Sequence, residues 1–234
     1  MKRTRLSLRA GEILDRLEKV YPDADCELDH GNAFELLIAT ILSAQCTDKR
    51  VNAVTPQLFA RYPRAMDLAS AKLPEVEEII RSTGFFRAKA KSITSCARAL
   101  VANHGGEVPR DFDAAVKLKG VGRKTASVVL GHAYGITKGI AVDTHVLRLT
   151  ARLGLTKHHD PIRVEQDLMK LVPKERWVRT TDQIIFHGRR TCDARKPRCG
   201  ECGIFDLCAW ASKQAYALGG SKPGAGAMKA RSKP

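Results

Sequence analysis

The chain has 234 residues, of which 40 are Lys or Arg and 25 are Asp or Glu, giving a formal net charge of +15. That length suits one large domain or two small ones, and the excess of positive charge points to a polyanion such as a nucleic acid, although a generally basic protein would show it too. No stretch is apolar enough to span a membrane. The basic start of the chain is followed by charged residues, whereas a signal peptide would continue with an apolar segment. We therefore expect a cytoplasmic, nucleoid-associated protein without a membrane partner.

Apolar residues recur at helical spacing along the chain, and no alternating strand pattern interrupts them. A first amphipathic helix is predicted over residues 8–21. The run 33–44 is apolar on nearly every face, which predicts a central buried helix. Thr47 or Asp48 can cap the next helix, which continues to Phe59. The other predicted helices span residues 75–82, 89–103, 111–118, 125–134, 144–153, 162–171 and 175–187. The fold class is therefore all-α.

The run L-K-G-V-G-R-K-T-A, residues 118–126, connects two of these helices. Gly120 and Gly122 punctuate it, because a tight connection needs backbone angles that glycine adopts cheaply. The run predicts a helix-hairpin-helix over about residues 111–135. Its backbone N–H groups and the start of the second helix can hold a DNA phosphate without reading sequence. The residues expected to contact DNA there are Gly120, Val121, Gly122 and Arg123.

Lys124 lies in the first turn of the second helix of this hairpin. The helix macrodipole disfavours a cation there, which favours the neutral amine, a nucleophile that can form a Schiff base. The alternative is that Lys124 only contacts a phosphate. Asp143, nineteen positions further on, is a carboxylate in an otherwise apolar run and therefore needs a partner or a task. Its presence favours a catalytic function for Lys124.

Four of the seven cysteines crowd near the end of the chain in the spacing C-x6-C-x2-C-x5-C. They are Cys192, Cys199, Cys202 and Cys208. In a reducing compartment such a set indicates metal ligation, by a tetrahedral zinc or by an iron–sulfur cluster. The number of ligands alone slightly favours zinc. Arg195, Lys196 and Arg198 form a cationic loop within the set that could lie on a DNA backbone.

The hairpin run, together with V-D-T-H at residues 142–145, resembles the endonuclease III branch of the helix-hairpin-helix DNA glycosylases. The similarity extends from about Arg9 to Trp210, and the cysteine spacing resembles the [4Fe–4S] loop of that family. The resemblance implies a [4Fe–4S] cluster on the four cysteines. In the family the hairpin lysine attacks the sugar of a flipped, damaged nucleotide and the aspartate assists it, so the resemblance implies these roles for Lys124 and Asp143.

Two loops carry further candidate residues. An enzyme that acts on a base must take it out of the stack, fill the gap and wedge the opposite strand. Gln45, in a motif L-S-A-Q-x-T-D similar to that of the family, is the candidate for filling the gap, and Phe85, after Gly84, resembles the wedge. The residues themselves leave open that Gln45 only ends a helix and that Phe85 and Phe86 belong to the core.

The resemblance also implies two helical lobes with a cleft between them, to which Lys124 and Asp143 come from different lobes. One lobe is a six-helix barrel over residues 25–135 that contains the hairpin. The other is a cluster lobe over residues 136–212, with the cluster loop at 192–208, joined by the helix within residues 1–24. Residues 213–234 are basic and rich in Gly and Ala, which predicts a disordered tail that attracts DNA weakly or only aids solubility.

The resemblance thus implies a monomeric, bifunctional DNA glycosylase and AP lyase of base excision repair. It would act on double-stranded DNA that contains oxidised pyrimidines or abasic sites, and cleave the strand by β-elimination. Two alternatives stay open, namely a monofunctional glycosylase or bare abasic-site lyase, and a non-catalytic DNA-binding module with a structural metal. Lys124 with Asp143 favours the enzyme, because a binding module needs the glycines but not that carboxylate. The related adenine-removing branch lacks a lysine at this position, so Lys124 argues against it.

Overall fold

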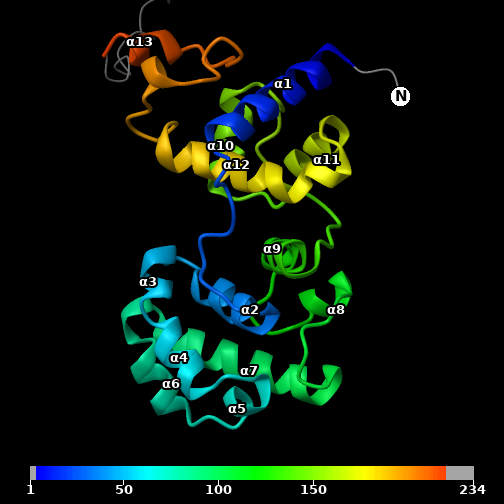
Figure 1. Ribbon diagram of the computed structural model, residues 1–234, viewed down its shortest axis with the longest axis vertical. Helices are drawn as coiled ribbons and strands as arrows, with labels where there is room; N and C mark the ends of the chain where they lie inside the picture. The colour runs from blue at the N-terminus through cyan, green and yellow to red at the C-terminus, as the bar shows by residue number, and fades with distance from the viewer. Residues whose placement is uncertain (1–3, 220–234) are drawn as a thin grey trace, which may run out of the picture. The chain divides into compact units, whose positions relative to one another are not determined.

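The computed structural model of the protein describes residues 4–219, and this part of the chain is helical and contains no strand, which confirms the all-α prediction (Figure 1). None of its helices is long and apolar enough to cross a membrane. The chain divides into two compact units, Asp25–Ala141 and Met1–Ala24 with Val142–Pro234. We describe each unit by itself.

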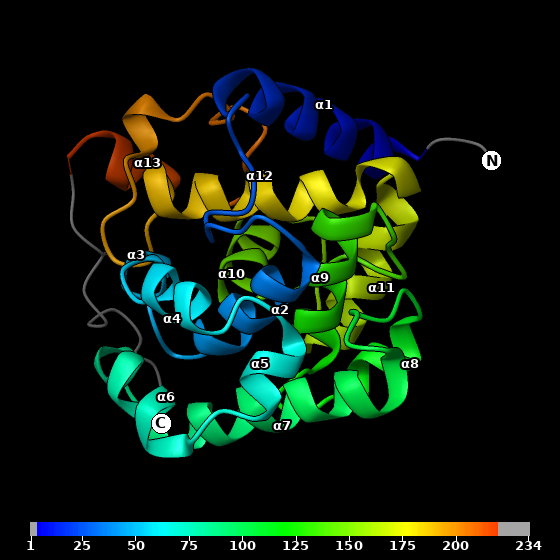
Figure 2. The same ribbon diagram turned by 60° about the horizontal axis from the view of Figure 1, so that its bottom comes forward.

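The unit Asp25–Ala141 is built around α2 (Ala33–Leu42), in which every residue except Ala33 and Glu35 is buried. This confirms the predicted central helix. The helices α7 (Phe86–His104) and α9 (Arg123–Tyr134) pack against α2, and α5 (Ala65–Ala69) and α6 (Leu73–Ile79) pack against α7 (Figure 2). The remaining elements of the unit are α3 (Asp48–Asn52), α4 (Thr55–Arg61), η1 (Arg81–Thr83) and α8 (Phe112–Val116).

The helix predicted from residue 48 to Phe59 is in fact two helices, α3 and α4. Thr47 caps α3, as predicted, by accepting a hydrogen bond from the backbone of Arg50. Pro56 stands at the start of α4. Because proline has no N–H to donate to the preceding turn, one continuous helix cannot pass through this position. The short helix α5 was not predicted from the sequence.

The second unit is organised around α12 (Trp177–Arg190), whose buried face includes Ile184, Phe186 and His187. The helices α1 (Arg5–Val20) and α10 (Thr144–Arg152) pack against α12 (Figure 1). A Cβ atom at Gly188 would lie 2.7 Å from Nδ1 of His145, so the contact of α12 with α10 requires glycine there. The other elements are α11 (Pro161–Leu171), η2 (Lys174–Arg176), η3 (Cys199–Glu201) and α13 (Lys213–Ala217).

Two expected boundaries differ from those of the structure. The first unit extends to Ala141 instead of ending at residue 135, because Ile136 packs against the core of that unit. The segment 213–217, expected to belong to a disordered tail, forms α13, and Lys213 binds two backbone carbonyls of the cysteine loop. Residues 220–234 of the expected tail lie outside the described residues.

Candidate functional site

The predicted hairpin is present in the first unit, with α8 before the turn and α9 after it. Gly120 has a φ of +84°, and the N–H of Val121 donates to the carbonyl of Leu118 at 3.1 Å. A Cβ atom at Gly120 would stand 3.2 Å from Cγ2 of Ile41 and 3.3 Å from Cβ of Ser92. The backbone conformation therefore favours glycine at this position, and the close packing of the turn on α2 and α7 leaves little room for a side chain.

Gly122 does not need the conformational freedom that the sequence suggested. Its φ is −92° and its ψ is 177°, which any residue adopts, and a Cβ atom there would meet nothing within 4 Å. Gly122 is instead the N-cap of α9 and has no side chain to bind the first N–H groups of that helix. The N-caps of α8 and α10, Asp111 and Asp143, bind such groups with their carboxylates. The start of α9 is thus suited to receive an external anion.

Lys124 is the second residue of α9 and its side chain is exposed, in the first turn as predicted. Arg123 stands beside it with its guanidinium carbon 5.2 Å from the centre of the Phe112 ring. The hairpin therefore presents an amine and a guanidinium next to the open helix N-terminus. Lys124 belongs to the unit Asp25–Ala141, whereas Asp143 belongs to the other unit.

Asp143 is half-buried and caps α10, with its Oδ1 accepting a hydrogen bond of 2.8 Å from the N–H of Val146. A negative charge at a helix N-terminus is stabilised by the helix dipole. Two residues further on, Nδ1 of His145 accepts a hydrogen bond of 3.0 Å from Arg148. Arg148 also donates to the carbonyl of Cys192, so it connects the start of α10 to the cysteine loop.

Gln45 and Phe85 are the two non-glycine residues with positive φ in residues 4–219, at +53° and +48°. Gln45 lies beyond the end of α2 at Leu42 and is exposed. Phe85 is 71% exposed, whereas Phe86 packs partly against the core. The interpretation of Phe85 as a core residue is therefore wrong, and Gln45 is not part of a helix. Left-handed backbone at a residue with a side chain is strained and is concentrated at functional sites.

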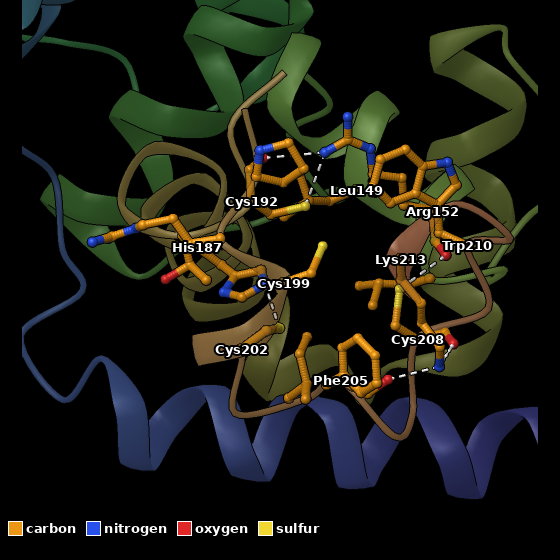
Figure 3. A pocket seen from close by; sticks show the side chains of 15 residues that line it. Leu149, Arg152, His187, Cys192, Cys199, Cys202, Phe205, Cys208, Trp210 and Lys213 are labelled. Carbon is orange, nitrogen blue, oxygen red and sulfur yellow. Dashed lines mark hydrogen bonds between the residues drawn. The ribbon is translucent and has the colours of Figure 1, made fainter. Parts of the chain in front are cut away.

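The four predicted cysteines of the second unit line a single cavity, and Figure 3 shows their sulfur atoms around it. None of the four forms a disulfide. Burial raises the pKa of Cys202 to about 11, since a thiolate there loses its hydration, and the positive charge of bound metal ions would offset that cost. The donor set and its burial fit either a zinc ion or an iron–sulfur cluster.

Two residues that the sequence analysis missed contact the cysteine sulfurs (Figure 3). Arg152 donates to Sγ of Cys192 at 3.1 Å, and Nε2 of His187 lies 3.6 Å from Sγ of Cys202. Burial lowers the pKa of His187 to about 4, so its ring is neutral near neutral pH. Hydrogen bonds to the sulfur ligands tune iron–sulfur clusters. The residues are 40 and 15 positions from the cysteines that they contact, so no local motif marks them.

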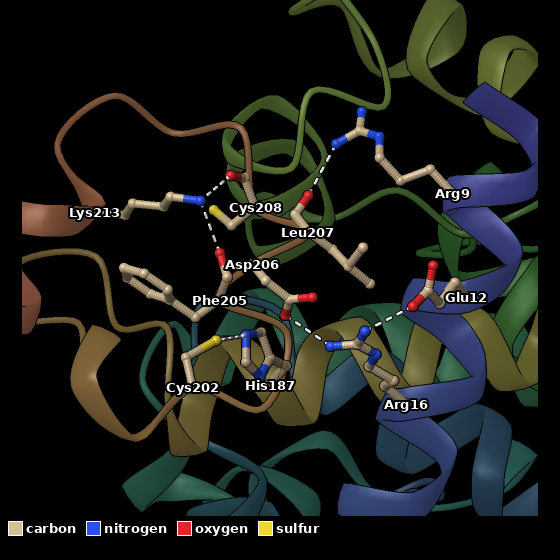
Figure 4. Close-up of polar contacts among 10 residues, drawn as sticks. All are labelled: Arg9, Glu12, Arg16, His187, Cys202, Phe205, Asp206, Leu207, Cys208 and Lys213. Carbon is tan, nitrogen blue, oxygen red and sulfur yellow. Dashed lines mark hydrogen bonds and ion pairs between the residues drawn. The ribbon is translucent and has the colours of Figure 1, made fainter. Parts of the chain in front are cut away.

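Charged side chains fix the loop that contains the last two cysteines (Figure 4). Lys213 donates from Nζ to the carbonyls of Phe205 and Cys208, at 2.8 and 2.6 Å. On the other side, Arg9 of α1 donates to the carbonyl of Leu207 at 2.9 Å, and Arg16 pairs with Asp206 at 2.7 Å. The position of the loop therefore depends on contacts from α1 and from α13.

The predicted cationic loop is divided by its contacts. Arg195 and Lys196 are exposed, and their backbone N–H groups donate to a carboxylate oxygen of Asp193. Arg198 instead binds the backbone carbonyl of Arg190. Its guanidinium also forms an ion pair with the carboxylate of Glu201 at 3.5 Å. Arg195 and Lys196 are consequently better placed to meet an external anion than Arg198.

Comparisons with known proteins match both parts of this site. Residues 38–174 match the family described as HhH-GPD superfamily base excision DNA repair protein, and residues 192–208 match the iron-sulfur binding domain of endonuclease III. The endonuclease III of Synechocystis sp. is 58% identical over 200 residues, which cover 86% of this chain and 91% of that protein. The endonuclease III of Escherichia coli K12 is 45% identical over 204 residues, covering 86% and 95%.

Among solved structures, a trapped covalent intermediate of endonuclease III with DNA is similar with a TM-score of 0.84 and 47% identity. It covers 89% of this chain and 98% of its own. The match of residues 192–208 decides between the two metals that the donor set left open. The cofactor is an iron–sulfur cluster, and the slight preference for zinc from the number of ligands is wrong.

Proposed function

Because the chain belongs to the endonuclease III family of the HhH-GPD superfamily of base excision DNA repair proteins, we propose that it excises oxidised pyrimidines from duplex DNA. It is a DNA glycosylase with AP lyase activity, and it binds DNA. The observation that carries the proposal is an exposed lysine in the first turn of α9, two residues after an N-cap that has no side chain. The substrates are duplexes that contain a damaged pyrimidine or an abasic site.

Binding begins at the hairpin. The N–H groups at Gly120 and Gly122 and the start of α9 receive a phosphate, Val121 holds the turn through its own bond to Leu118, and Arg123 adds a positive charge beside the phosphate. Because this grip involves the backbone of the DNA and not its bases, it is independent of sequence. Arg195 and Lys196 of the cysteine loop make further phosphate contacts, and Arg198 contributes to the positive charge of that loop.

The extrusion of the damaged nucleotide falls to Gln45 and Phe85. Gln45 fills the gap that the nucleotide leaves, since its amide can hydrogen-bond to the unpaired base. The exposed ring of Phe85 wedges the opposite strand. The strained backbone at both residues is compatible with such roles, because strain is retained where it serves binding.

Lys124 is the nucleophile. Its neutral amine forms a bond to C1′ of the sugar as the bond from C1′ to the base breaks, and the base leaves with a proton. The sugar ring opens to give an imine of Lys124. The imine acidifies the C2′ proton, whose removal expels the 3′ phosphate and breaks the strand. Asp143 accepts the proton of the attacking amine or stabilises the positive charge that develops on the sugar.

The cofactor is a [4Fe–4S] cluster, and the thiolates that hold it are those of Cys192, Cys199, Cys202 and Cys208. When bound, the cluster supplies a structural crosslink, and we assign it no step of the reaction. It joins the end of α12 to the loop that Lys213 and Arg9 also fix. A brown colour of the purified protein and an iron content of about four atoms per chain, as a [4Fe–4S] cluster requires, would test this assignment.

The catalytic residues can be tested by trapping the imine with borohydride on a duplex that contains thymine glycol. The wild-type protein should form a covalent adduct, and Lys124→Gln should form none. Asp143→Asn should bind the duplex but release the base slowly. Lys117→Gln removes the same charge from the end of α8 and should still form the adduct.

The outcomes separate the alternatives. Base release without an adduct would replace the proposal by a monofunctional glycosylase, and an adduct with abasic DNA alone would indicate a bare lyase. Tight binding without either would leave a DNA-binding module. A parallel duplex with an oxidised purine tests the lesion, because preferential release of the purine would contradict the proposed substrate class.

The protein works as a monomer in the cytoplasm, on the nucleoid. Sedimentation of the full chain, free and with a short duplex, tests the monomer. A complex with two protein chains on one lesion would contradict it. Fractionation of the native cells tests the location.

A further inference from the structure

The turn that carries Phe85 is strained in a way that its own side chain does not relieve. Gly84 and Phe85 both have positive φ, at +69° and +48°, directly before α7. Glycine adopts this backbone region freely, but an aromatic residue does so only at a cost. Burial of the ring does not offset the cost, since Phe85 is 71% exposed. Other contacts must therefore hold the turn.

Lys89, in the first turn of α7, binds the backbone on both sides of this pair. Its N–H donates to the carbonyl of Phe85 at 3.0 Å, and its Nζ donates to the carbonyl of Thr83 at 2.7 Å. Thr83 is buried and fixed in turn, because its hydroxyl donates to the carbonyl of Ile80 at 2.8 Å. The helix backbone at Lys89 thus holds the Phe85 end of the turn, and the lysine side chain holds the Thr83 end.

The ammonium group of Lys89 is in an unusual place for a lysine, with the residue only 6% exposed. Lysine side chains are rarely buried to this extent, because the charged group loses its hydration. Burial accordingly lowers the pKa of Lys89, and the nearby thiol of Cys46 opposes that shift. A buried amine whose hydrogen bond ends on a turn carbonyl is costly to keep if its only use is packing.

The turn of Phe85 also adjoins the other proposed insertion loop. That loop contains Gln45 and Cys46 and leads into α3. The helix α3 that follows this loop contacts η1, which precedes the turn of Phe85. The two residues with strained backbone therefore stand in loops whose flanking elements, α3 and η1, contact each other.

We propose that Lys89 is a positioning residue that holds the Gly84–Phe85 turn, with Phe85 in its left-handed conformation, so that the Phe85 ring can wedge the DNA. The inference rests on the proposed function of Phe85. Lys89 does not touch the reacting atoms. Its effect reaches the reaction only through the turn and the ring that the turn presents.

A double-mutant cycle tests this dependence. The rate of base release from a thymine-glycol duplex is measured in single turnovers for the wild type, Lys89→Met, Phe85→Ala and the double variant. Methionine keeps the apolar stem and removes the amine. Lys89→Met should lower the rate by about tenfold while the affinity for undamaged duplex stays within about twofold. In the Phe85→Ala background, it should cause no further loss, because the wedge is already absent.

Three outcomes would overturn the inference. If Lys89→Met lowers the rate by the same factor in both backgrounds, Lys89 acts independently of Phe85. If Lys89→Met alone leaves the rate unchanged, the turn does not need the amine. If Phe85→Ala leaves the rate unchanged, the wedge assignment itself fails, which is a different result from the first two. If Lys89→Met has a lower thermal unfolding midpoint than the wild type, the same cycle is run with Lys89→Gln, which keeps a neutral hydrogen-bond donor.

Discussion

Replacing Gly120 by alanine should destabilise the protein through the hairpin turn. The left-handed backbone costs about 1–2 kcal/mol for a residue with a Cβ atom. The added methyl would stand 3.2 Å from the buried side chain of Ile41 and 3.3 Å from Cβ of Ser92, and such crowding costs about 1–3 kcal/mol. Alanine also lowers the conformational entropy of the unfolded chain, which stabilises the folded state by about 0.4–1 kcal/mol. The net expected loss is about 1–5 kcal/mol, with a central value near 3 kcal/mol.

Gly122→Ala is the matched control, two residues away in the same turn. Its φ of −92° and the open space around its Cβ position remove both penalties. The lower entropy of the unfolded chain is offset by the loss of a favourable N-cap residue, so the free energy of unfolding should change by less than about 0.5 kcal/mol. Urea unfolding followed by far-UV circular dichroism measures both variants against the wild type. Equal stability of the two variants would refute the reasoning.

Three further predictions concern the cluster loop, a surface ion pair and the core. Arg152→Gln should speed the loss of iron to a chelator, followed by the visible absorbance, because the guanidinium no longer clamps the cluster loop; an unchanged rate would contradict this. Arg179 hydrogen-bonds the Glu18 carboxylate and holds its pKa below the usual range. The pair therefore stabilises the fold at pH values above the ordinary pKa of a glutamate, and this stabilisation is lost as the pH falls through the lowered pKa of Glu18. Glu18→Gln should therefore cost about 0.5 kcal/mol near neutral pH in urea unfolding, and the difference should vanish in acid. Leu37→Ala, in the buried helix α2, should cost about 2–5 kcal/mol, whereas exposed Ile162→Ala should change stability by less than about 0.5 kcal/mol.

Local patterns in the sequence were sufficient where the physical cause is itself local. The apolar run of α2 predicts its burial, because nearly every face of that helix carries apolar side chains. Asp111 predicts the start of α8, because a capping carboxylate acts within three residues of itself. The spacing of the four cysteines predicts their common cavity for the same reason.

Features that depend on distant partners were not predicted. The sequence F-F after Gly84 is typical of a core, and only the left-handed turn sends Phe85 outward while Phe86 packs inward. Nothing in the sequence near Arg152 indicates that it will bind a sulfur 40 residues away. The break between α3 and α4 was predictable, since Pro56 alone excludes a continuous helix there.

The discontinuous second unit has a consequence for the synthesis of the protein. The helix α1 buries Ala10, Ile13, Leu14 and Leu17 against elements that follow residue 141. Arg9 finds the carbonyl of Leu207 only after 198 further residues have been added, which takes roughly 10–40 s at about 5–20 residues per second. The unit Asp25–Ala141 is complete earlier, so an apolar face of α1 stays uncovered on the ribosome while its neighbour in the chain can already fold. A nascent chain halted near residue 150 should therefore hold its first helix available to chaperones.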